Sequence, residues 1–248
     1  MATRLAHPKF RGRQGNLDPC ASCEARPLSV CNAIDNADIA HLAEIAVVVE
    51  AAPGRCFIDE GERADYFFNI TAGTVKLFKL LPDGRRQITG FVGIGHFLGL
   101  AVSDTYAFSA EAIDNVRYCR FNRGKLRALL DKFPLMETRL LEVAANELVA
   151  AQEQMLLLGR KTARERLASF LSLQSRQGAP CGRPRIRFTL AMTRSDIADY
   201  LGLTIETVSR TLTRLRAEGL IDFAAQHDVV VRDPASLGAL ADGLLTKA

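Results

Sequence analysis

Four of the six cysteines in this chain have a spacing that suits a metal group. Cys20, Cys23 and Cys31 lie close together, separated by two and then seven residues, and Cys119 stands alone much later in the chain. An iron–sulfur cubane is commonly held by four thiolates. A flexible segment that supplies three thiolates and a distant anchor that supplies the fourth would meet this need. The pattern therefore indicates a [4Fe-4S] cluster held by these four residues.

Two other chemistries could use the same four thiols. Zinc also binds four thiolates, although structural zinc sites usually contain two closely spaced pairs. The thiols could instead respond to oxidants directly, by forming disulfides without any metal. Cys56 and Cys181 have no close cysteine neighbour in the sequence, and we expect ordinary roles for both. Cys181 lies in a Gly- and Pro-rich stretch, where an exposed thiol could be oxidised.

The composition is that of an ordinary globular protein. The chain has 248 residues, of which 48% are hydrophobic and 24% charged, enough for two modest domains. No apolar run approaches the roughly 20 residues needed to span a bilayer. The basic N-terminus lacks the apolar stretch of a signal peptide. We therefore expect a cytoplasmic protein without membrane contact, and in that reducing compartment cysteines favour metal or redox chemistry over structural disulfides.

The sequence divides into four zones that predict an α+β fold. Residues 1–32 form a cysteine-rich segment without periodicity, which needs a bound group or a partner surface to become ordered. Residues 33–134 contain short β-like runs punctuated by glycines and a Pro-Asp-Gly turn at Leu81–Arg85, typical of an antiparallel β-roll, jelly-roll-like in form. In one such run, Val75–Leu80, alternate residues predict a roughly amphipathic strand. Residues 135–160 predict one long helix, and residues 161–248 a winged helix-turn-helix domain.

The long helix carries a heptad-like apolar stripe. Leu141, Leu148 and Met155 fall seven residues apart, and small residues such as Ala151 fill alternate positions. Such a stripe predicts a dimerisation seam, in which alanine allows close approach of two helices. The alternative is a helix that packs its stripe against its own domain.

The C-terminal zone contains the pattern of a DNA-reading element. Thr193 and Asp196 predict a capping box for one helix, Gly202 predicts the tight turn that follows, and Thr204 predicts the cap of a second helix from Ile205 to Glu218. The second helix would read bases with its exposed N-terminal residues. Arginine can bond guanine, glutamate can accept from cytosine, and serine and threonine can bond several base edges. The predicted DNA-binding residues are Thr204, Glu206, Thr207, Ser209, Arg210, Thr213 and Arg214.

The charge distribution agrees with a polyanionic partner. The net charge is +4. From Arg160 onward the chain contains 14 Lys and Arg residues and 9 Asp and Glu residues, which gives this part a net charge of +5. A basic C-terminal part on a near-neutral body favours contact with double-stranded DNA.

The order of these elements resembles the CRP/FNR superfamily of transcription regulators. The resemblance rests on Thr193–Arg210 as the winged helix, on Phe68–Gly73 as part of the sensor roll, and on the long helix between them. It covers nearly the whole chain. Glu206, Ser209 and Arg210 match the Glu-x-x-Ser-Arg pattern of the FNR branch, which implies a palindrome of TTGAT-type half-sites bound by a homodimer. The resemblance also implies that RNA polymerase is a partner, with the turn from Pro82 to Arg86 as a candidate contact.

The resemblance bears on the sensor as well. CRP-like members bind cyclic AMP with a Glu and an Arg-Ser pair, whereas this chain has Leu100 and Phe108 at the matching positions of the Glu and the Arg. An anionic phosphate would lack its cation there, so we expect no cyclic nucleotide binding. Oxygen-sensing FNR-type proteins carry three N-terminal cysteines and one distant cysteine at matching places, with a second spacing that looks alphaproteobacterial here. By this resemblance the cluster favours the DNA-binding dimer and oxygen destroys it.

Two other classes of protein are a regulator without an iron–sulfur cluster and an enzyme. A cluster-free or zinc-bound regulator, controlled by thiol oxidation or by its expression level, is the alternative to the oxygen sensor. An enzyme is not expected, because His7, His41, His96 and His227 are scattered and none neighbours a plausible nucleophile in a recognisable motif.

At the seam of the long helix, small and uncharged Ala151 suggests a dimer that persists without the cluster. In that case the switch acts on the posture of the DNA-binding domain.

Overall fold

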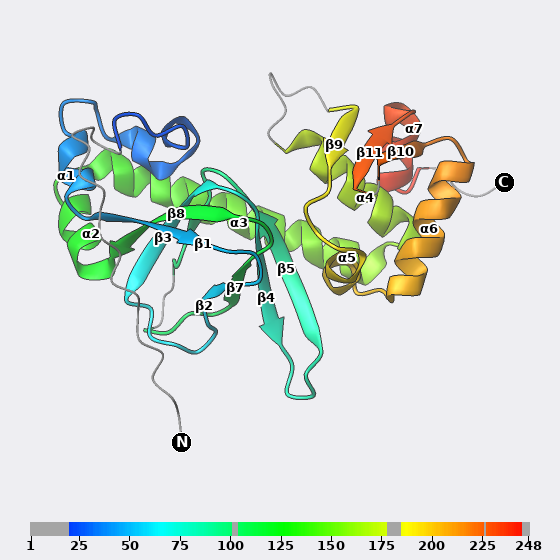
Figure 1. Cartoon of the computed structure of the whole chain (residues 1–248), viewed down its shortest axis with the longest axis horizontal. Coiled ribbons are helices and arrows are strands. Elements are labelled where there is room, and N and C mark those ends of the chain that lie inside the picture. Colours follow the sequence, from blue (N-terminus) through cyan, green and yellow to red (C-terminus); the bar gives the residue numbers. More distant parts are fainter. Residues whose placement is uncertain (1–19, 101–103, 178–184, 226, 245–248) are drawn as a thin grey trace.

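The computed structural model describes residues 20–100, 104–177, 185–225 and 227–244 (Figure 1). A β-rich N-terminal domain and a mainly helical C-terminal domain lie at the two ends of the long helix α3 (Pro134–Arg160), which runs along both (Figure 1). The predicted fold class, an antiparallel roll, a long helix and a C-terminal helix-turn-helix, is confirmed. Within the described ranges no helix has the length and apolar character that a membrane crossing requires.

The N-terminal roll consists of two four-stranded sheets in which all neighbours are antiparallel. The first sheet has the order β1 (Ala46–Ala51), β8 (Val116–Asn122), β3 (Tyr66–Ala72) and β6 (Phe97–Leu98). The second has the order β2 (Cys56–Ile58), β7 (Ser109–Ala112), β4 (Val75–Leu80) and β5 (Arg86–Val92). The strands β4 and β5 extend beyond the roll as a hairpin (Figure 1).

Aromatic side chains fill the space between the two sheets. Phe57 stacks on Tyr118 with ring centroids 4.5 Å apart, and Phe68 meets Tyr118 edge-on at 5.6 Å. The strands alternate, so that Phe68 and Tyr118 point into the roll while Phe67 and Phe121 point out of it. The first sheet therefore packs on both of its faces.

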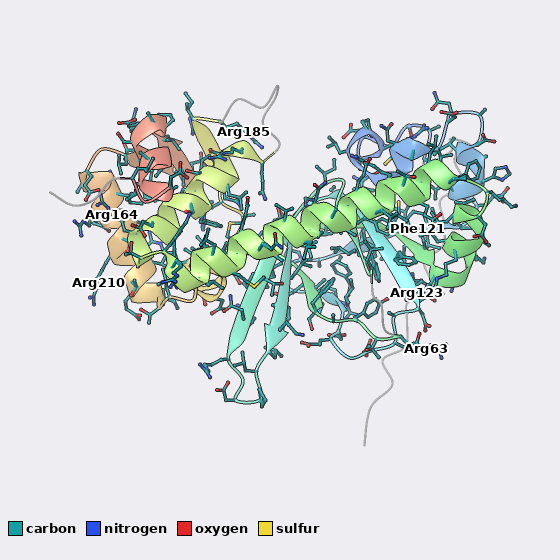
Figure 2. All side chains as sticks on the ribbon, turned by 180° about the vertical axis from the view of Figure 1, so that it is seen from behind. Arg63, Phe121, Arg123, Arg164, Arg185 and Arg210 are labelled. Atoms are coloured by element: carbon teal, nitrogen blue, oxygen red, sulfur yellow. The ribbon has the colours of Figure 1, made fainter. Side chains whose placement is uncertain are left out.

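The outer face of the first sheet is covered by the cysteine-rich segment and by helices. The covering elements are the 3₁₀ turns η1 (Arg26–Leu28) and η2 (Val30–Ala33), the helices α1 (Ile39–Ala43) and α2 (Arg123–Leu130), and the start of α3. Phe121 is only 1% exposed in this layer and lies beside the end of α3 that covers the roll (Figure 2). This second apolar layer is what orders the described part of the cysteine-rich segment.

The C-terminal domain combines helices with a small sheet of order β10, β11, β9. Its elements are α4 (Ala163–Arg176), β9 (Arg187–Thr189), α5 (Arg194–Leu201), α6 (Ile205–Ala217), β10 (Ile221–Ala225), β11 (Asp228–Val231) and α7 (Pro234–Ala241). Val208, Leu212 and Leu215 of α6 are buried, as their helical spacing predicts. The strand β9 and the helix α7 were not predicted, and α6 ends one residue before the predicted Glu218.

The amphipathic pattern expected for Val75–Leu80 is wrong in one respect. Val75, Lys76, Leu77 and Phe78 are all buried, whereas Lys79 and Leu80 are exposed. Both faces of the first part of β4 are covered, one by the roll interior and the other by the C-terminal domain. Strict alternation between core and solvent holds only where one face of a strand meets water.

A glycine provides a test of how the cysteine-rich segment packs on the roll. Gly95 has φ +88°, and a Cβ there would lie 2.7 Å from both the Cβ and the carbonyl oxygen of Leu28. Gly61 has a similar φ of +82° but open space around it. We expect Gly95→Ala to lower the free energy of unfolding by about 1–3 kcal/mol more than Gly61→Ala, since only the first adds a steric clash to the shared backbone strain. Equal losses in chemical denaturation would contradict the close packing of Leu28 on Gly95.

Candidate cysteine cluster and nucleic-acid interface

The four predicted cysteine ligands are brought to one side of the roll. Cys20 and Cys31 are 8% and 7% exposed, and they belong to the apolar layer on the outer face of the first sheet. Cys119, in the middle of β8, packs against the same layer. Cys23 follows Cys20 by one turn, with its backbone N–H donating to the Cys20 carbonyl at 3.4 Å. None of these described cysteines is joined in a disulfide.

The pKa values of the thiols are raised mainly by burial and further by the neighbouring thiols. Burial raises the pKa of Cys119 to about 12, and the neighbouring thiols Cys20, Cys31 and Cys23 contribute to that increase while Arg117 opposes it. Burial also raises the pKa of Cys31 to about 11, against a hydrogen bond with Ser29. Buried thiolates that repel one another require a cation to be stable. A positively charged metal group would supply that charge and displace the protons.

Asn69 connects the sheet to the cysteine-rich segment, and sequence reasoning missed it. It is paired with Cys119 across β3 and β8, it is 1% exposed, and its side-chain nitrogen donates to the sulfur of Cys31 at 3.9 Å. Amide donors to ligating sulfurs orient them and influence the group that they hold. No local signal marks Asn69, because only the strand register places it between Cys31 and Cys119.

The donor set contains four thiols, the number that commonly holds an iron–sulfur cubane. Within the described ranges, no three His, Cys, Asp or Glu side chains form a group that could hold one metal ion. Four thiolates on a cubane need not converge on one point, because each binds a different iron. The four thiols supply the required number of sulfur donors in an apolar environment, so the residues fit a [4Fe-4S] cluster.

The remaining cysteines lie elsewhere. Cys56, in β2 of the second sheet, donates to the carbonyl oxygen of Ile58 at 3.1 Å, and its pKa is raised to about 12, mainly by burial. It is therefore a protonated thiol, packed against the core that the second sheet shares with the C-terminal domain, and the ordinary role expected for it stays a prediction. Cys181 lies outside the described residues.

The region that matches a cyclic nucleotide site has apolar residues at its key positions. Phe108, which stands in place of the Arg, packs against the core of the roll, and Leu100 is 37% exposed. Residues 101–103 between them lie outside the described ranges. The prediction that this chain binds no cyclic nucleotide stays a prediction.

The helix-turn-helix has the predicted local geometry. The Thr193 hydroxyl accepts from the backbone N–H of Asp196 at 3.1 Å, while Asp196 accepts from the backbone N–H of Thr193 at 3.1 Å. Gly202 adopts φ +61° at the end of α5, and the Thr204 hydroxyl caps α6 by accepting from the backbone N–H of Thr207 at 3.2 Å. These caps fix where α5 ends and where α6 begins.

The predicted base-reading residues lie on the outer face of α6. Glu206 and Arg210 are exposed and Ser209 is partly exposed; Arg210 is at the end of the molecule away from the roll (Figure 2). Hydrogen bonds from its own backbone N–H and from the Thr204 side chain, together with nearby Arg210, lower the pKa of Glu206. The ionised carboxylate can accept from a cytosine amino group, and Arg210 can bond guanine.

The other predicted DNA-binding residues make contacts within the domain. Arg214 pairs with Glu218 at 3.0 Å, Thr213 donates to the Ser209 carbonyl at 3.0 Å, and the Thr204 and Thr207 hydroxyls lie 3.1 Å apart. Arg194, at the start of α5, was not predicted, yet it donates to the Ser209 hydroxyl at 3.4 Å from an exposed position. In helix-turn-helix proteins the first helix of the motif crosses the DNA backbone, and an exposed arginine at its start could contact a phosphate there.

The stripe predicted for dimerisation is exposed along α3. Leu141, Leu148 and Met155 are 67%, 60% and 65% exposed, and Ala151 between them is exposed too. The alternative, in which the helix packs this stripe against its own domain, is therefore wrong. Exposed apolar residues at heptad spacing are typical of a helix that pairs with a second copy.

Comparison with known proteins identifies the family. Residues 165–240 match the Crp-like helix-turn-helix domain, and residues 48–133 match the cyclic nucleotide-binding domain. The chain is 42% identical over 219 residues to the transcriptional activatory protein AadR of Rhodopseudomonas palustris, covering 88% of this chain and 91% of AadR. It is 40% identical over 228 residues to the nitrogen fixation regulation protein FixK of Bradyrhizobium diazoefficiens, covering 90% and 93% of the two chains.

A solved structure supports the same assignment. The structure of FixK2 from Bradyrhizobium japonicum aligns with a TM-score of 0.74 at 35% identity, covering 82% of this chain and 100% of that chain. These relatives are transcription regulators rather than enzymes, and the DNA-binding helix-turn-helix is shared with them. The chain therefore belongs to the CRP/FNR family of transcription regulators, together with alphaproteobacterial proteins such as AadR and FixK.

Proposed function

We propose that this regulator responds to oxygen through a [4Fe-4S] cluster bound by Cys20, Cys23, Cys31 and Cys119. The observation that carries the proposal is the placement of Cys119, on the sheet face that the cysteine-rich segment covers, where the other three thiols influence its pKa. The cluster, when bound, supplies iron and sulfide that react with oxygen.

The chain's own residues give the cluster its environment. The apolar layer around Cys20 and Cys31 limits water, and Arg117 and Arg26 favour the charged form of Cys119 and Cys31 respectively. Only one ligand, Cys119, belongs to the rigid sheet, whereas the other three belong to a segment held by packing. Loss of the cluster would thus leave the roll intact and leave the segment held by its apolar packing alone.

The proposed output is binding of a homodimer to a palindrome of TTGAT-type half-sites. Paired α3 stripes would join two copies, and each α6 would enter the major groove of one half-site.

Contact with RNA polymerase is proposed at the exposed turn between β4 and β5, residues Pro82–Arg85. Arg86, the last residue assigned to that contact from the sequence, instead pairs with Asp196 and Asp199 in the C-terminal domain.

Metal analysis of anaerobically purified protein tests the proposal. We expect about four irons and matching sulfide per chain, with a broad visible absorption that bleaches in air. Zinc in place of iron, or no metal despite strict anaerobic handling, would overturn the oxygen-sensor proposal and leave the assignment as a DNA-binding regulator intact.

Removal of one thiol tests the ligand assignment. Cys119→Ala should lose most of the iron and sulfide while retaining the far-ultraviolet circular dichroism of the wild type, because β8 keeps its strand partners. Cys56→Ala is the matched control, since Cys56 lies in the other sheet and should leave the metal content unchanged. Full iron content in Cys119→Ala would rule out Cys119 as a ligand.

Removal of the Arg210 guanidinium tests whether α6 recognises bases. Arg210→Ala should lose about 1–3 kcal/mol of preference for a TTGAT palindrome over a duplex in which the G:C pair of each half-site is replaced by A:T. Arg216→Ala is the control on the same helix, because Arg216 pairs with Asp222 of β10 at 3.0 Å. Fluorescence anisotropy with both duplexes measures the preference, and an unchanged preference in Arg210→Ala would contradict the placement of the recognition helix.

Sedimentation tests the proposed dimer. Cluster-free wild-type protein should sediment as a dimer at micromolar concentration, because apolar and small residues along the α3 stripe pair without help from the cluster. Leu148→Glu should produce monomers, since it places like charges at the centre of the seam, whereas Asn146→Glu, on the opposite side of the helix, should not. Monomeric cluster-free wild type would show that dimerisation itself depends on the cluster.

A further inference from the structure

The β4–β5 hairpin of the roll holds the first helix of the DNA-binding motif. The Lys76 ammonium lies 3.1 Å from the Asp196 carboxylate, and the two side chains are only 10% and 6% exposed. Arg86 reaches the same Asp196 carboxylate at 3.1 Å and that of Asp199 at 2.8 Å. Gln87 donates to the Asp199 carbonyl at 2.8 Å. Two charged groups and one amide of the roll therefore bind α5 directly.

Asp196 joins this contact to the helix cap. One oxygen, Oδ2, accepts from the backbone N–H and the hydroxyl of Thr193 in the capping box, while the other, Oδ1, accepts from Lys76 and Arg86. Although burial opposes ionisation, hydrogen bonds from Thr193 and Lys76 lower the pKa of Asp196. A single carboxylate thus helps to cap the N-terminal end of α5 and ties that helix to the other domain.

The far end of α5 is held as well. Gln154 of α3 donates to the Tyr200 carbonyl at 2.9 Å. Arg166 of α4 donates to the Leu201 carbonyl at 2.9 Å and to the Leu158 carbonyl of α3 at 2.8 Å. Carbonyls at the C-terminal end of a helix lack partners within it, so these side chains satisfy groups that would otherwise need water.

An apolar contact lies beneath the polar one. Phe91 of β5 meets Tyr200 with ring centroids 5.3 Å apart and Phe170 of α4 at 6.1 Å. Phe78 and Ile88 of the hairpin belong to the same buried cluster as the core of the C-terminal domain. The two domains therefore share one core at this point, and the polar contacts fix the register in which they meet.

The contact leaves the base-reading face of α6 open. Arg210 lies at the end of the molecule away from the roll (Figure 2), and Glu206 and Arg210 are exposed. The hairpin approaches α5, and α5 lies between the roll and α6 (Figure 1). The posture held by the hairpin is thus compatible with entry of α6 into a groove.

We propose that Lys76, Arg86 and Gln87 form an interdomain latch that positions the helix-turn-helix for a palindromic operator. Two half-sites of a palindrome fix the separation and orientation of the two recognition helices of a dimer. A domain that swings about the junction between α3 and α4 reaches this arrangement only part of the time, and its apparent affinity falls by that fraction. The latched domain avoids this loss. The latch residues are positioning residues, since none of them lies on the base-reading face.

Neighbouring arginines of the hairpin provide a matched test. Arg86→Gln removes the charge that pairs with Asp196 and Asp199, whereas Arg85→Gln removes an exposed charge that pairs with Asp83 inside the turn at 2.8 Å. The probes are a duplex with the TTGAT palindrome and a duplex with one half-site, titrated with anaerobically purified full-length protein. We expect Arg86→Gln to weaken palindrome binding about tenfold, with little change for the single half-site. We expect Arg85→Gln to change neither, because the polymerase contact proposed for Arg85 plays no part in a titration without polymerase.

A second pair of variants controls for folding. Lys76→Met breaks the buried contact with Asp196, whereas Lys79→Met, on the same strand, breaks a pair with Glu60 at 2.8 Å inside the roll. Small-angle X-ray scattering should give a larger radius of gyration for Lys76→Met and Arg86→Gln than for Lys79→Met, Arg85→Gln or the wild type. Thermal unfolding identifies any variant that has simply lost its fold.

The outcomes distinguish a failure of the latch proposal from a failure of the proposed operator. Equal losses on the palindrome and the half-site, or an unchanged affinity for the palindrome, would overturn the positioning role. Failure of the wild type to prefer the TTGAT duplex would overturn the proposed operator, and the scattering comparison would then decide the latch by itself. An unchanged radius of gyration in both latch variants would overturn it.

Discussion

The buried ion pair between Lys76 and Asp196 is the interaction on which the arrangement of the two domains depends. A buried charge is stable only with a partner and satisfied hydrogen bonds. Here Glu111 also pairs with Lys76, and Arg86 also pairs with Asp196. Separation of the domains would leave Lys76 and Glu111 on one surface and Asp196 on the other. The polar contact therefore specifies one docking geometry, while the shared apolar core around Phe91 stabilises it.

The cysteine-rich segment depends on the roll through a different kind of contact. The first sheet has two apolar faces, so its outer face must be covered, and Val30, Cys31 and Ile34 cover part of it. This packing brings three thiols to Cys119, in a setting where burial disfavours their charged form. A metal group and the apolar layer would then order the same segment together, which links the proposed sensor to the surface of the roll.

Local sequence signals predicted the helix-turn-helix well. Thr193 with Asp196, Gly202 and Thr204 act on backbone groups within four residues of themselves, so their effect is visible without the fold. The heptad stripe of α3 is equally local in origin, and the structure leaves it exposed. The strand β9 was missed because it is only three residues long and owes its place to pairing with β11. The helix α7 was also missed, although Asp233 and Pro234 give it a local start signal.

The sequence by itself determined the residue types that can do chemistry: four cysteines, a capped helix pair with an arginine near the start of its second helix, and an apolar stripe. The tertiary structure alone decided which residues meet. Asn69 reaches Cys31 because of the register between β3 and β8, and Lys76, which a simple alternation of strand faces would assign to solvent, is buried because α5 covers that face. Periodicity reports which side of an element is apolar, but long-range pairing sets what lies against it.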